Sequence, residues 1–210
     1  MRRCVIFCAG GFDRLITPIL ESDYIIAADG GFSHTQKLSI TPNAILGDFD
    51  SLGYTPEKAV VFPVEKDDTD AMLAIRHGLS LGYQDFLIYG ALDGPRLDHT
   101  LAALQTLQFL TRENARGMLV GLSQMATVIQ NETLSFPAGC KGIFSMFALS
   151  GAAEGITLKG LYYPLENGTL TPDFPLGVSN HFTGEAASVT LAKGNLTILW
   201  DRENPLPQRR

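Results

Sequence analysis

Short apolar runs alternate with helix-period segments through the first 123 residues, and this alternation constrains the fold more than any other feature of the chain. Continuous apolar runs such as residues 4–9 and 24–28 are typical of strands buried on both faces. Strands that alternate with helices form a mostly parallel sheet with helices on both faces. Residues 1–123 are therefore predicted to form a Rossmann-like α/β/α domain. The predicted strands are residues 4–9, 24–28, 44–46, 59–64, 86–89 and 118–121. The predicted helices are residues 13–20, a short helix that follows the turn at residues 29–31 and runs through Lys37, and residues 69–81 and 98–110.

The pattern changes after about Ser123, where helix-period segments stop and short strand-like runs begin. Such runs, separated by turn residues, are typical of an all-β sandwich. Residues 124–210 are therefore predicted to form a second domain, a jelly-roll-like β-sandwich whose last residues, 204–210, are frayed. The predicted strands are residues 127–129, 142–149, 156–161, 187–191 and 196–200, and turns are expected at residues 132–133, 166–168 and 193–195.

Composition narrows the class of protein. The 210 residues carry a net charge of −6, which argues against a general nucleic-acid binder because such a protein needs a basic surface. The apolar start of the chain is interrupted by Gly10-Gly11 and is too short for a signal peptide or a membrane span. Three cysteines, without zinc-ligand spacing, are expected to be reduced. We expect a cytoplasmic protein that binds neither nucleic acid nor a membrane.

Acidic or glycine-rich turns follow five of the predicted strands. The carboxyl ends of parallel strands lie at one edge of a sheet, so these turns are expected to share the crevice where such sheets bind ligands. Carboxylates gathered there repel one another unless cations offset their charge. The turn at residues 10–11 lacks the third glycine of the dinucleotide fingerprint, which argues against a nicotinamide site. The five turns contain residues 10–11, 29–31, 47–51, 66–70 and 90–99.

Asp48 and Asp50 are the first metal-ligand candidates. They lie two positions apart at the end of a predicted strand, so their side chains are expected to leave it on the same face. Converging carboxylate oxygens suit Mg²⁺, which completes its shell with water and phosphate. The alternative is an acidic turn in which Asp50 or Ser51 caps the following segment, since Asp and Ser are ordinary turn and cap residues.

The other turns also have structural alternatives. Residues 67–69 stand where a helix N-cap belongs, and Asp70 in the first turn can complement the helix dipole. Lys66 can be an ordinary solvated lysine. Arg96 precedes a predicted helix and offers a planar fork for phosphate, while Asp98 is a candidate N-cap.

In their order and spacing these motifs resemble the thiamine pyrophosphokinase family, and the resemblance covers nearly the whole chain. It rests on Asp-Gly-Gly at residues 29–31, Gly-Asp-Phe-Asp-Ser at 47–51, Asp-Asp-Thr-Asp at 67–70 and Gly-Pro-Arg-Leu-Asp-His at 94–99. In the second domain it continues with Lys-Gly-Leu-Tyr-Tyr-Pro-Leu at 159–165 and Leu-Gly-Val-Ser-Asn at 176–180. One departure is Pro95, where the family often has glycine; proline removes a backbone donor from the turn that carries Arg96.

The resemblance implies both a reaction and its residues. The reaction is transfer of the diphosphate of ATP to the thiamine hydroxyl, giving thiamine diphosphate and AMP, with Mg²⁺ as cofactor. The family's Mg²⁺ ligands correspond to Asp48, Asp50 and Asp70. Further pocket positions correspond to Asp29 and Asp98, and we assign catalytic roles to these two residues and Asp70.

The resemblance also implies a role for the second domain in thiamine binding. Tyr163 holds the position of the aromatic residue that stacks on the vitamin, and Ser179 and Asn180 match the family's Ser-Asn contact. Family members are homodimers in which the second domain of one subunit helps to close the thiamine pocket of the other. A homodimer with thiamine sites at the subunit interface is therefore expected.

The expected mechanism is attack of the thiamine hydroxyl on the β-phosphorus of ATP in one step. Such a transfer needs alignment and charge neutralisation more than covalent help from the protein. Lys66 and Arg96 are assigned cationic contacts to the phosphates, and Asp70 or Asp98 is expected to take the hydroxyl proton. Three alternatives stay open at this point: another hydroxymethyl heterocycle such as a pterin as acceptor, a Mg²⁺-dependent phosphohydrolase, and a non-catalytic nucleotide sensor.

Overall fold

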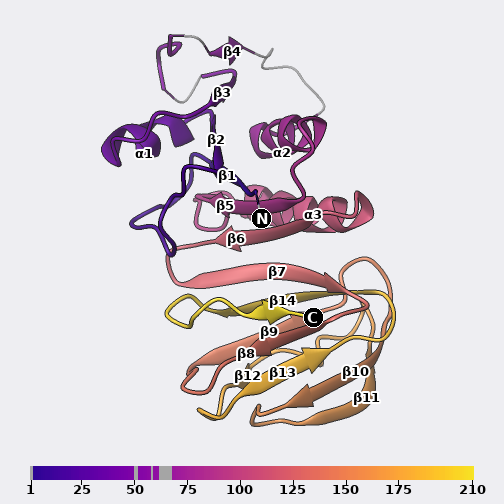
Figure 1. Cartoon of the computed structure of the whole chain (residues 1–210). Helices are drawn as coiled ribbons and strands as arrows, with labels where there is room; N and C mark the ends of the chain where they lie inside the picture. The colour runs from indigo at the N-terminus through magenta and orange to yellow at the C-terminus, as the bar shows by residue number, and fades with distance from the viewer. Residues whose placement is uncertain (1, 50–51, 58, 62–67) are drawn as a thin grey trace. The chain divides into compact units, whose positions relative to one another are not determined.

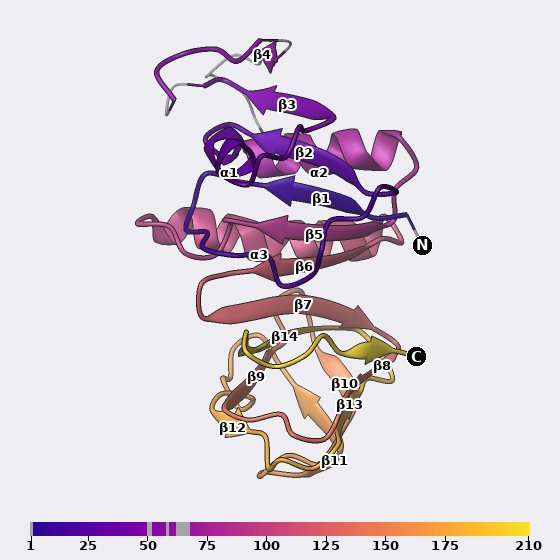
Figure 2. The same ribbon diagram turned by 60° about the vertical axis from the view of Figure 1, so that its left-hand side comes forward.

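The computed structural model describes residues 2–49, 52–57, 59–61 and 68–210. Within them the chain divides into two compact units, one that ends at Leu122 and one that begins at Ser123. Figures 1 and 2 show the two units as ribbons from two directions. Among the helices of the described residues, none has the length and apolar character needed to cross a membrane.

The first unit contains a parallel sheet. Its strands lie in the order β4-β3-β2-β1-β5-β6, and every neighbouring pair is parallel. Because the strands are parallel, their carboxyl ends share one edge, as the arrowheads in Figure 2 show. Of the strand predicted over residues 59–64, residues 62–64 lie outside the described residues. The strands are β1 (Cys4–Phe7), β2 (Tyr24–Ala28), β3 (Ala44–Gly47), β4 (Val60–Val61), β5 (Asp85–Tyr89) and β6 (Arg116–Val120).

Helices cover both faces of this sheet. The helix α1 (Gly31–Lys37) lies on one face with the segment that joins β1 to β2, and α2 (Asp70–Ser80) and α3 (Leu97–Arg112) pack together on the other (Figure 1). The strands between these layers are apolar because both of their faces are covered: all residues of β1 and all but the first of β2 and β5 are buried. The predicted α/β/α architecture is confirmed.

The helix predicted over residues 13–20 is wrong. Residues 11–22, all of which the structure describes, contain neither helix nor strand. Pro18 gives a local reason, because proline lacks an N–H and its ring clashes with the carbonyl four residues earlier in a helix. The Arg3 guanidinium instead donates to the Thr17 hydroxyl at 2.8 Å and to the Pro18 carbonyl at 2.5 Å. Hydrogen bonds from the Arg3 side chain therefore hold this segment in place of the backbone hydrogen bonds of a helix.

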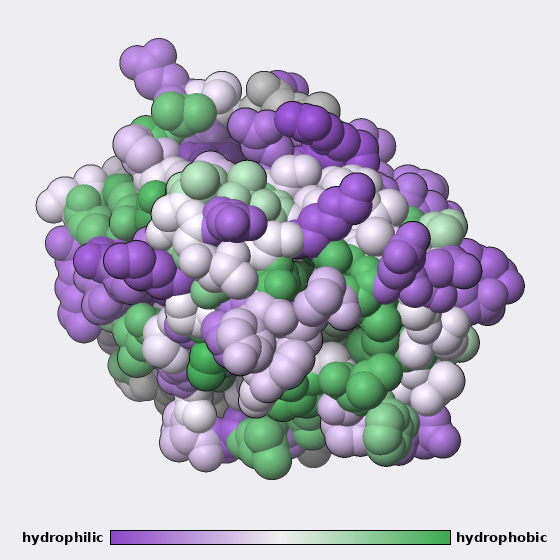
Figure 3. Space-filling view, turned by 90° about the horizontal axis from the view of Figure 1, so that it is seen from below, coloured by the Kyte–Doolittle hydropathy of each residue, from purple (hydrophilic) through white to green (hydrophobic). Residues whose placement is uncertain are grey.

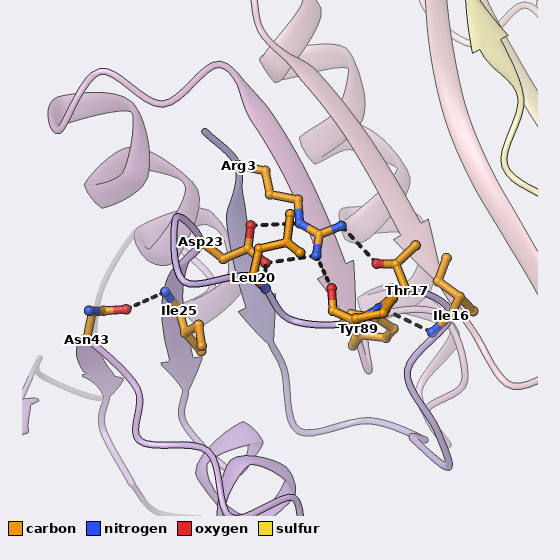
Figure 4. Close-up of polar contacts among 9 residues, drawn as sticks. Arg3, Ile16, Thr17, Leu20, Asp23, Ile25, Asn43 and Tyr89 are labelled. Atoms are coloured by element: carbon orange, nitrogen blue, oxygen red, sulfur yellow. Dashed lines mark hydrogen bonds and ion pairs between the residues drawn. The ribbon is translucent and has the colours of Figure 1, made fainter. Parts of the chain in front are cut away.

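A largely buried ion pair holds the end of the same segment (Figure 4). The Asp23 carboxylate lies 2.8 Å from Arg3 and also accepts from the Leu20 N–H at 2.8 Å. Nearer the start of the segment, the Ile16 N–H donates to the Tyr89 hydroxyl at 3.2 Å. The connection between two parallel strands must cross from one edge of the sheet to the other, usually as a helix. Here the crossing is made by a loop that hydrogen bonds with Arg3, Asp23 and Tyr89 hold in place.

The buried face of α3 differs from the predicted one. Leu101, Leu104 and Leu107 were expected on one face, but Leu101 is 55% exposed. A helix turns by about 100° per residue, so positions six apart differ by about 120° in direction and do not share a face. The apolar side chains that are buried along α3 are those of Ala103, Leu107 and Leu110, whose spacing of four and three residues keeps them on one side.

The second unit consists of two antiparallel sheets and contains no helix; all of its residues are described. One sheet has the order β7-β14-β9-β12 and the other has the order β11-β10-β13-β8-β15. The strands are β7 (Gln124–Gln130), β8 (Thr133–Phe136), β9 (Ile143–Phe147), β10 (Ala153–Lys159), β11 (Leu165–Leu170), β12 (Asn180–His181), β13 (Ala187–Thr190), β14 (Asn195–Asp201) and β15 (Gln208–Arg209).

Aromatic side chains fill the space between these two sheets. Phe136 on β8 meets Phe144 on β9 and Trp200 on β14 edge to face, with ring centroids 5.8 and 5.5 Å apart. Phe182 packs on Phe136 and Phe144 at 5.0 and 5.5 Å. Because the rings come from both sheets and lie between them, the second unit is a β-sandwich, as predicted.

Two predicted turns of the second unit lie partly or wholly within strands. The turn expected at residues 132–133 is made earlier, at Asn131 with φ +50°, and Thr133 already belongs to β8. The turn expected at residues 166–168 is part of β11, where Asn167 has φ +49° and the pairing with β10 shifts register. Asn tolerates the left-handed conformation, so it marks a kink in a strand as readily as a turn.

The C-terminal tail, predicted to be frayed, is held in the sandwich. Its strand β15 pairs with the edge of β8. The Arg209 guanidinium donates to the Glu132 carboxylate at 2.7 Å and to the Val128 carbonyl at 3.2 Å. The Arg209 and Glu132 side chains are only 14% and 17% exposed, so a polar tail here contains a largely buried ion pair.

Candidate active site

Three carboxylates come together at the carboxyl edge of the first unit's sheet. Asp29 follows β2, Asp48 follows β3 and Asp70 begins α2, and one oxygen of each lies within 4.8 Å of the others. Asp29 is buried, and the other two are half-buried. The structure thus brings together two of the predicted metal ligands, Asp48 and Asp70, and adds Asp29, which was predicted as a catalytic pocket residue.

Close backbone packing brings Asp29 and Asp48 together. Asp29 has φ +47°, a left-handed conformation that Asp tolerates, and its N–H donates to the Leu46 carbonyl at 2.8 Å. A Cβ at Gly47 would lie 2.9 Å from the Asp29 Cα, so glycine allows the two turns to meet. On the other side of Asp48, the Phe49 side chain is buried and anchors the turn.

Gly31 sets the Asp29 turn directly on the end of β1. A Cβ at this position would lie 1.9 Å from the Phe7 carbonyl oxygen, so no larger residue fits. The next residue of that strand end, Cys8, lies near the carboxylates. Burial raises the pKa of the Cys8 thiol to about 12, and the charges of Asp70 and Asp29 add to the rise. Cys8 is therefore a neutral thiol beside the cluster.

Asp70 occupies the first turn of α2, where the helix dipole favours negative charge. The preceding Thr69 caps the helix, since its hydroxyl accepts from the Met72 N–H at 3.2 Å. Asp68, another predicted cap, forms an ion pair with Arg76 at 2.9 Å instead. Thr69 thus caps α2, and the Asp70 carboxylate is part of the cluster.

The donor set fits a magnesium ion. Carboxylate oxygens are the hard ligands that Mg²⁺ takes, with water and phosphate oxygens filling its remaining positions. Three like charges within 4.8 Å also repel one another, and a cation offsets that repulsion. Two further predicted site residues, the ligand Asp50 and the phosphate contact Lys66, lie outside the described residues.

Arg96 and Asp98 form an ion pair at the start of α3. The helix begins at Leu97 with Arg96 as N-cap, so the expectation that Asp98 is the N-cap is wrong. An Arg96 nitrogen lies 2.6 Å from the Asp98 carboxylate, and both side chains are 65% exposed. The Arg96 hydrogen bond lowers the pKa of Asp98, so this carboxylate is ionised at neutral pH. Exposed pairs of this kind are weak, and phosphate can compete for the guanidinium.

The turn after β1 is tied to its neighbours on both sides. The Gly10 carbonyl lies 2.9 Å from His34 Nε2, and that nitrogen carries a proton because a carbonyl only accepts. Burial lowers the pKa of His34. The Gly11 N–H donates to the Asp93 carbonyl at 2.9 Å. Asp93 was not among the predicted site residues, although it carries the same signal as Asp29: an acid in a turn after a parallel strand.

The predicted thiamine contacts lie together in the second unit. The Asn180 amide accepts from the Tyr163 N–H at 3.0 Å and donates to the Tyr163 carbonyl at 2.8 Å. Asn180 is buried, whereas the Tyr163 side chain is exposed. The neighbouring Ser179 has φ +62°, and its N–H donates to the Ser145 hydroxyl at 3.1 Å. The Asn180 side chain therefore fixes the backbone that presents the Tyr163 ring.

Tyr163 belongs to an exposed group of rings. The Tyr162 ring stacks on His181 with centroids 4.4 Å apart and meets Tyr163 edge to face at 4.9 Å. Figure 3 shows one face of the molecule, on which apolar side chains lie among hydrophilic ones. Exposed ring faces attract flat cationic ligands. The other exposed large apolar side chains of the second unit are those of Ile143, Leu149, Phe174, Leu176, Val178 and Leu206.

Two family models match the chain, in the order of its two units. The model described as "Thiamin pyrophosphokinase, catalytic domain" matches residues 17–119, and the one described as "Thiamin pyrophosphokinase, vitamin B1 binding domain" matches residues 131–196. The chain belongs to the thiamine pyrophosphokinase family. The catalytic-domain match includes the three clustered carboxylates, and the vitamin B1-binding match includes Tyr163 and Asn180.

Individual members of the thiamine pyrophosphokinase family resemble the chain along nearly its whole length. The thiamine pyrophosphokinase of Bacillus subtilis is 28% identical over 211 residues, 91% of this chain and 95% of its own. The crystal structure of the B. subtilis enzyme superposes with a TM-score of 0.83 at 23% identity and covers 95% and 98% of the two chains. A family protein from Enterococcus faecalis gives 0.75 at 26% identity, with 96% and 99% covered. The enzyme from Candida albicans shares the fold at 14% identity, with a TM-score of 0.74 and 95% and 88% covered.

Proposed function

We propose that the protein transfers the diphosphate of ATP to the hydroxyl of thiamine, giving thiamine diphosphate and AMP. Family membership carries this proposal, because models for a catalytic domain and for a vitamin B1-binding domain match consecutive parts of the chain. The carboxylate cluster supports it independently, since handling a polyphosphate calls for a divalent cation.

We assign a Mg²⁺ site to Asp29, Asp48 and Asp70, with Asp50 as a further predicted ligand. When bound there, Mg²⁺ neutralises the charge of the phosphate oxygens and of the leaving group. Asp29 and Asp48 are positioned by backbone contacts that side-chain motion does not disturb, namely the approach of Gly47 to the Asp29 Cα. The ligands are thus held in place before the nucleotide arrives, which is the arrangement that positional catalysis requires.

In the transfer step the thiamine hydroxyl oxygen forms a bond to the β-phosphorus of ATP. The bond from that phosphorus to the oxygen it shares with the α-phosphorus breaks, and AMP leaves with this oxygen. Arg96 exchanges its exposed partner Asp98 for a phosphate oxygen. The hydroxyl proton passes to Asp70 or Asp98; a carboxylate suffices as base because the transition state is loose and depends on positioning.

Thiamine recognition is assigned to the second unit, where Tyr163 offers an exposed ring to the cationic vitamin. We propose a homodimer in which this surface completes the site of the other subunit, a role supported by the exposed apolar side chains of the second unit. Light scattering of the purified protein at several concentrations tests the dimer; a monomer at all of them would contradict it.

A cytoplasmic location is proposed as well. The three cysteines are buried and form no disulfide. Burial raises the pKa of the Cys4 and Cys8 thiols to about 12, so both are protonated and unreactive at neutral pH. Reduced, buried thiols suit a reducing compartment.

The experiment that tests the function is AMP release from Mg-ATP with and without thiamine, with the products resolved by mass. Thiamine-dependent AMP together with thiamine diphosphate is the expected result. AMP that forms only with another hydroxymethyl heterocycle would keep the chemistry and overturn the acceptor. Phosphate release without an acceptor would replace the proposal with a phosphohydrolase, and nucleotide binding without turnover would replace it with a sensor.

A further inference from the structure

Asp93 connects three turns at the carboxyl edge of the first unit's sheet. It lies in the turn after β5, and its carbonyl accepts from the Gly11 N–H in the turn after β1 at 2.9 Å. Its carboxylate accepts from the Leu122 N–H, beyond the end of β6, at 2.5 Å. In the sheet β5 lies between β1 and β6, so one residue ties the turns of three neighbouring strands.

The packing around these hydrogen bonds is tight. A Cβ at Gly10 would lie 2.6 Å from the Gly90 carbonyl oxygen, to which the Gly10 N–H already donates at 2.8 Å. A Cβ at Gly11 would lie 2.9 Å from the Asp93 carbonyl oxygen and 2.8 Å from a methyl of Leu122. The two glycines thus let the turn after β1 lie directly against the turn that contains Asp93.

These turns border the proposed reaction site on both sides. Three residues after Asp93, Arg96 offers its guanidinium at the start of α3. On the other side, Gly31 packs on the Phe7 carbonyl at the end of β1, two residues after the clustered carboxylate Asp29. A shift of the turn after β5 therefore changes the distance between the phosphate-facing arginine and the carboxylate cluster.

We infer that Asp93 is a positioning residue for the nucleotide: it sets the turn that carries Arg96 relative to the carboxylates. This inference rests on the proposed function. Asp93 is not assigned as a ligand, because its negative charge would repel phosphate and one carboxylate oxygen is bonded to a backbone N–H. Its effect is transmitted through the backbone, so it is expected to change nucleotide binding and not thiamine binding.

The test compares Asp93→Ala with Asp93→Asn. Asn keeps an oxygen that can accept from the Leu122 N–H, whereas Ala removes the acceptor. We expect Asp93→Ala to raise the KM for ATP, and the Kd for a non-hydrolysable Mg-ATP analogue, on the order of tenfold or more, since small misplacements near a reacting centre have large effects. The KM for thiamine is expected to stay unchanged, and Asp93→Asn is expected to remain within about threefold of wild type.

Two further variants separate positioning from loss of stability. Gly11→Ala keeps the aspartate at position 93 but adds a methyl group against the turn that contains it. This variant is expected to reproduce the ATP-specific defect even if Asp93→Ala folds poorly. Asp23→Ala removes a carboxylate that also accepts a backbone N–H, but at the amino edge, and is expected to leave both KM values unchanged. Figure 4 shows that side chain with its partners Arg3 and Leu20.

Two results would overturn the inference. One is a wild-type Kd for the analogue in both Asp93→Ala and Gly11→Ala. The other is an Asp93→Asn variant as defective as Asp93→Ala, because the charge and not the hydrogen bond would then matter. A wild-type protein that binds the analogue but forms no thiamine diphosphate would overturn the proposed function alone, and the Kd values would still decide the role of Asp93.

Discussion

The two edges of the first unit's sheet use carboxylates in opposite ways. At the amino edge, the buried Asp23 carboxylate is paired with Arg3 at 2.8 Å and accepts a backbone N–H as well. At the carboxyl edge, Asp29, Asp48 and Asp70 place three oxygens of like charge within 4.8 Å of one another. A carboxylate with its arginine supports the fold, whereas carboxylates that lie together repel one another, and a cation offsets that repulsion. The sheet thus has a carboxylate paired with an arginine at its amino edge and a cluster of carboxylates at its carboxyl edge.

Glycine also differs between the edges. Gly82, in the turn before β5 at the amino edge, has φ +83° and open space where a Cβ would lie. At the carboxyl edge, a Cβ at Gly31 or Gly47 would lie 1.9 or 2.9 Å from neighbouring backbone atoms. The first glycine supplies an unusual backbone conformation, and the others supply close approach between segments. Close approach is what lets residues from different strands converge on one site.

The largest expected effect is on turnover at the carboxyl edge. Asp48→Asn should lower kcat by on the order of a thousandfold, because a charged ligand at the transferring group is lost. Without Mg²⁺ the variant should be at least as stable as wild type, since one of three repelling charges is gone. Initial rates and urea unfolding measure the two quantities, with Asp85→Asn at the amino edge as control. Wild-type turnover in Asp48→Asn would contradict the catalytic role that we assign to the carboxyl edge.

The second effect is on stability at the amino edge. Asp23→Ala should lower the free energy of unfolding by about 3 kcal/mol, because it removes the charged partner of the mostly buried Arg3 guanidinium and the acceptor of the Leu20 N–H. Urea unfolding measures the loss. Kinetic constants of the folded protein should not change, and a raised KM for ATP would show that the two edges are not separate.

The third prediction concerns Tyr163 and Asn180, the residues of the second unit to which we assign thiamine binding. Asn180→Ala removes two hydrogen bonds to Tyr163 and should lower stability by about 2 kcal/mol. It should also raise the KM for thiamine roughly tenfold, equivalent to about 1.4 kcal/mol, while the KM for ATP stays constant. Tyr163→Ala is the matched variant: the same thiamine defect with little change in stability. Unaltered thiamine kinetics in both would exclude these residues from the site.

The smallest effect, expressed per pH unit, concerns pH and the amino edge. Burial, with a contribution from Asp23, raises the pKa of the Cys4 thiol from 9.0 to about 12. Below pH 9 the thiol is protonated in both states; between pH 9 and 12 only the unfolded chain loses the proton, so stability falls as pH rises. The thiol contributes at most about 1.4 kcal/mol per pH unit. Urea unfolding at successive pH values should show a shallower decline in Cys4→Ala, and an unchanged slope would contradict the assignment.

The sequence predicted what periodicity and turn chemistry control directly. Buried strands such as β2 and the capped helix α2 follow from local patterns, and so do the turns that carry Asp48 and Asp70. The helix expected at residues 13–20 was wrong for two reasons: Pro18 disfavours it locally, and contacts with Arg3, distant in sequence, hold the segment in another conformation. The ion pair of Arg209 was not predicted because its partner, Glu132, is also distant in sequence.

The candidate site was predicted in its location but not in its internal arrangement. Acidic turns after parallel strands indicated the carboxyl edge, which is where the cluster lies. That Asp29 lies with Asp48 and Asp70 in one cluster depends on the approach of Gly47, a contact between two strands that no local pattern encodes. That Asn180 is buried behind Tyr163 depends on the fold of the sandwich in the same way.

Metal binding at the three carboxylates can be measured directly with Mn²⁺, which is visible by electron paramagnetic resonance, in place of Mg²⁺. Titration of the wild-type protein in the presence of ATP should show one tightly bound ion, and Asp29→Asn should weaken it as strongly as Asp48→Asn or Asp70→Asn. Asp29 is the decisive position, because the cluster geometry and not a sequence motif places it among the ligands. Wild-type Mn²⁺ affinity in Asp29→Asn would contradict a metal site made by the converging turns of this edge.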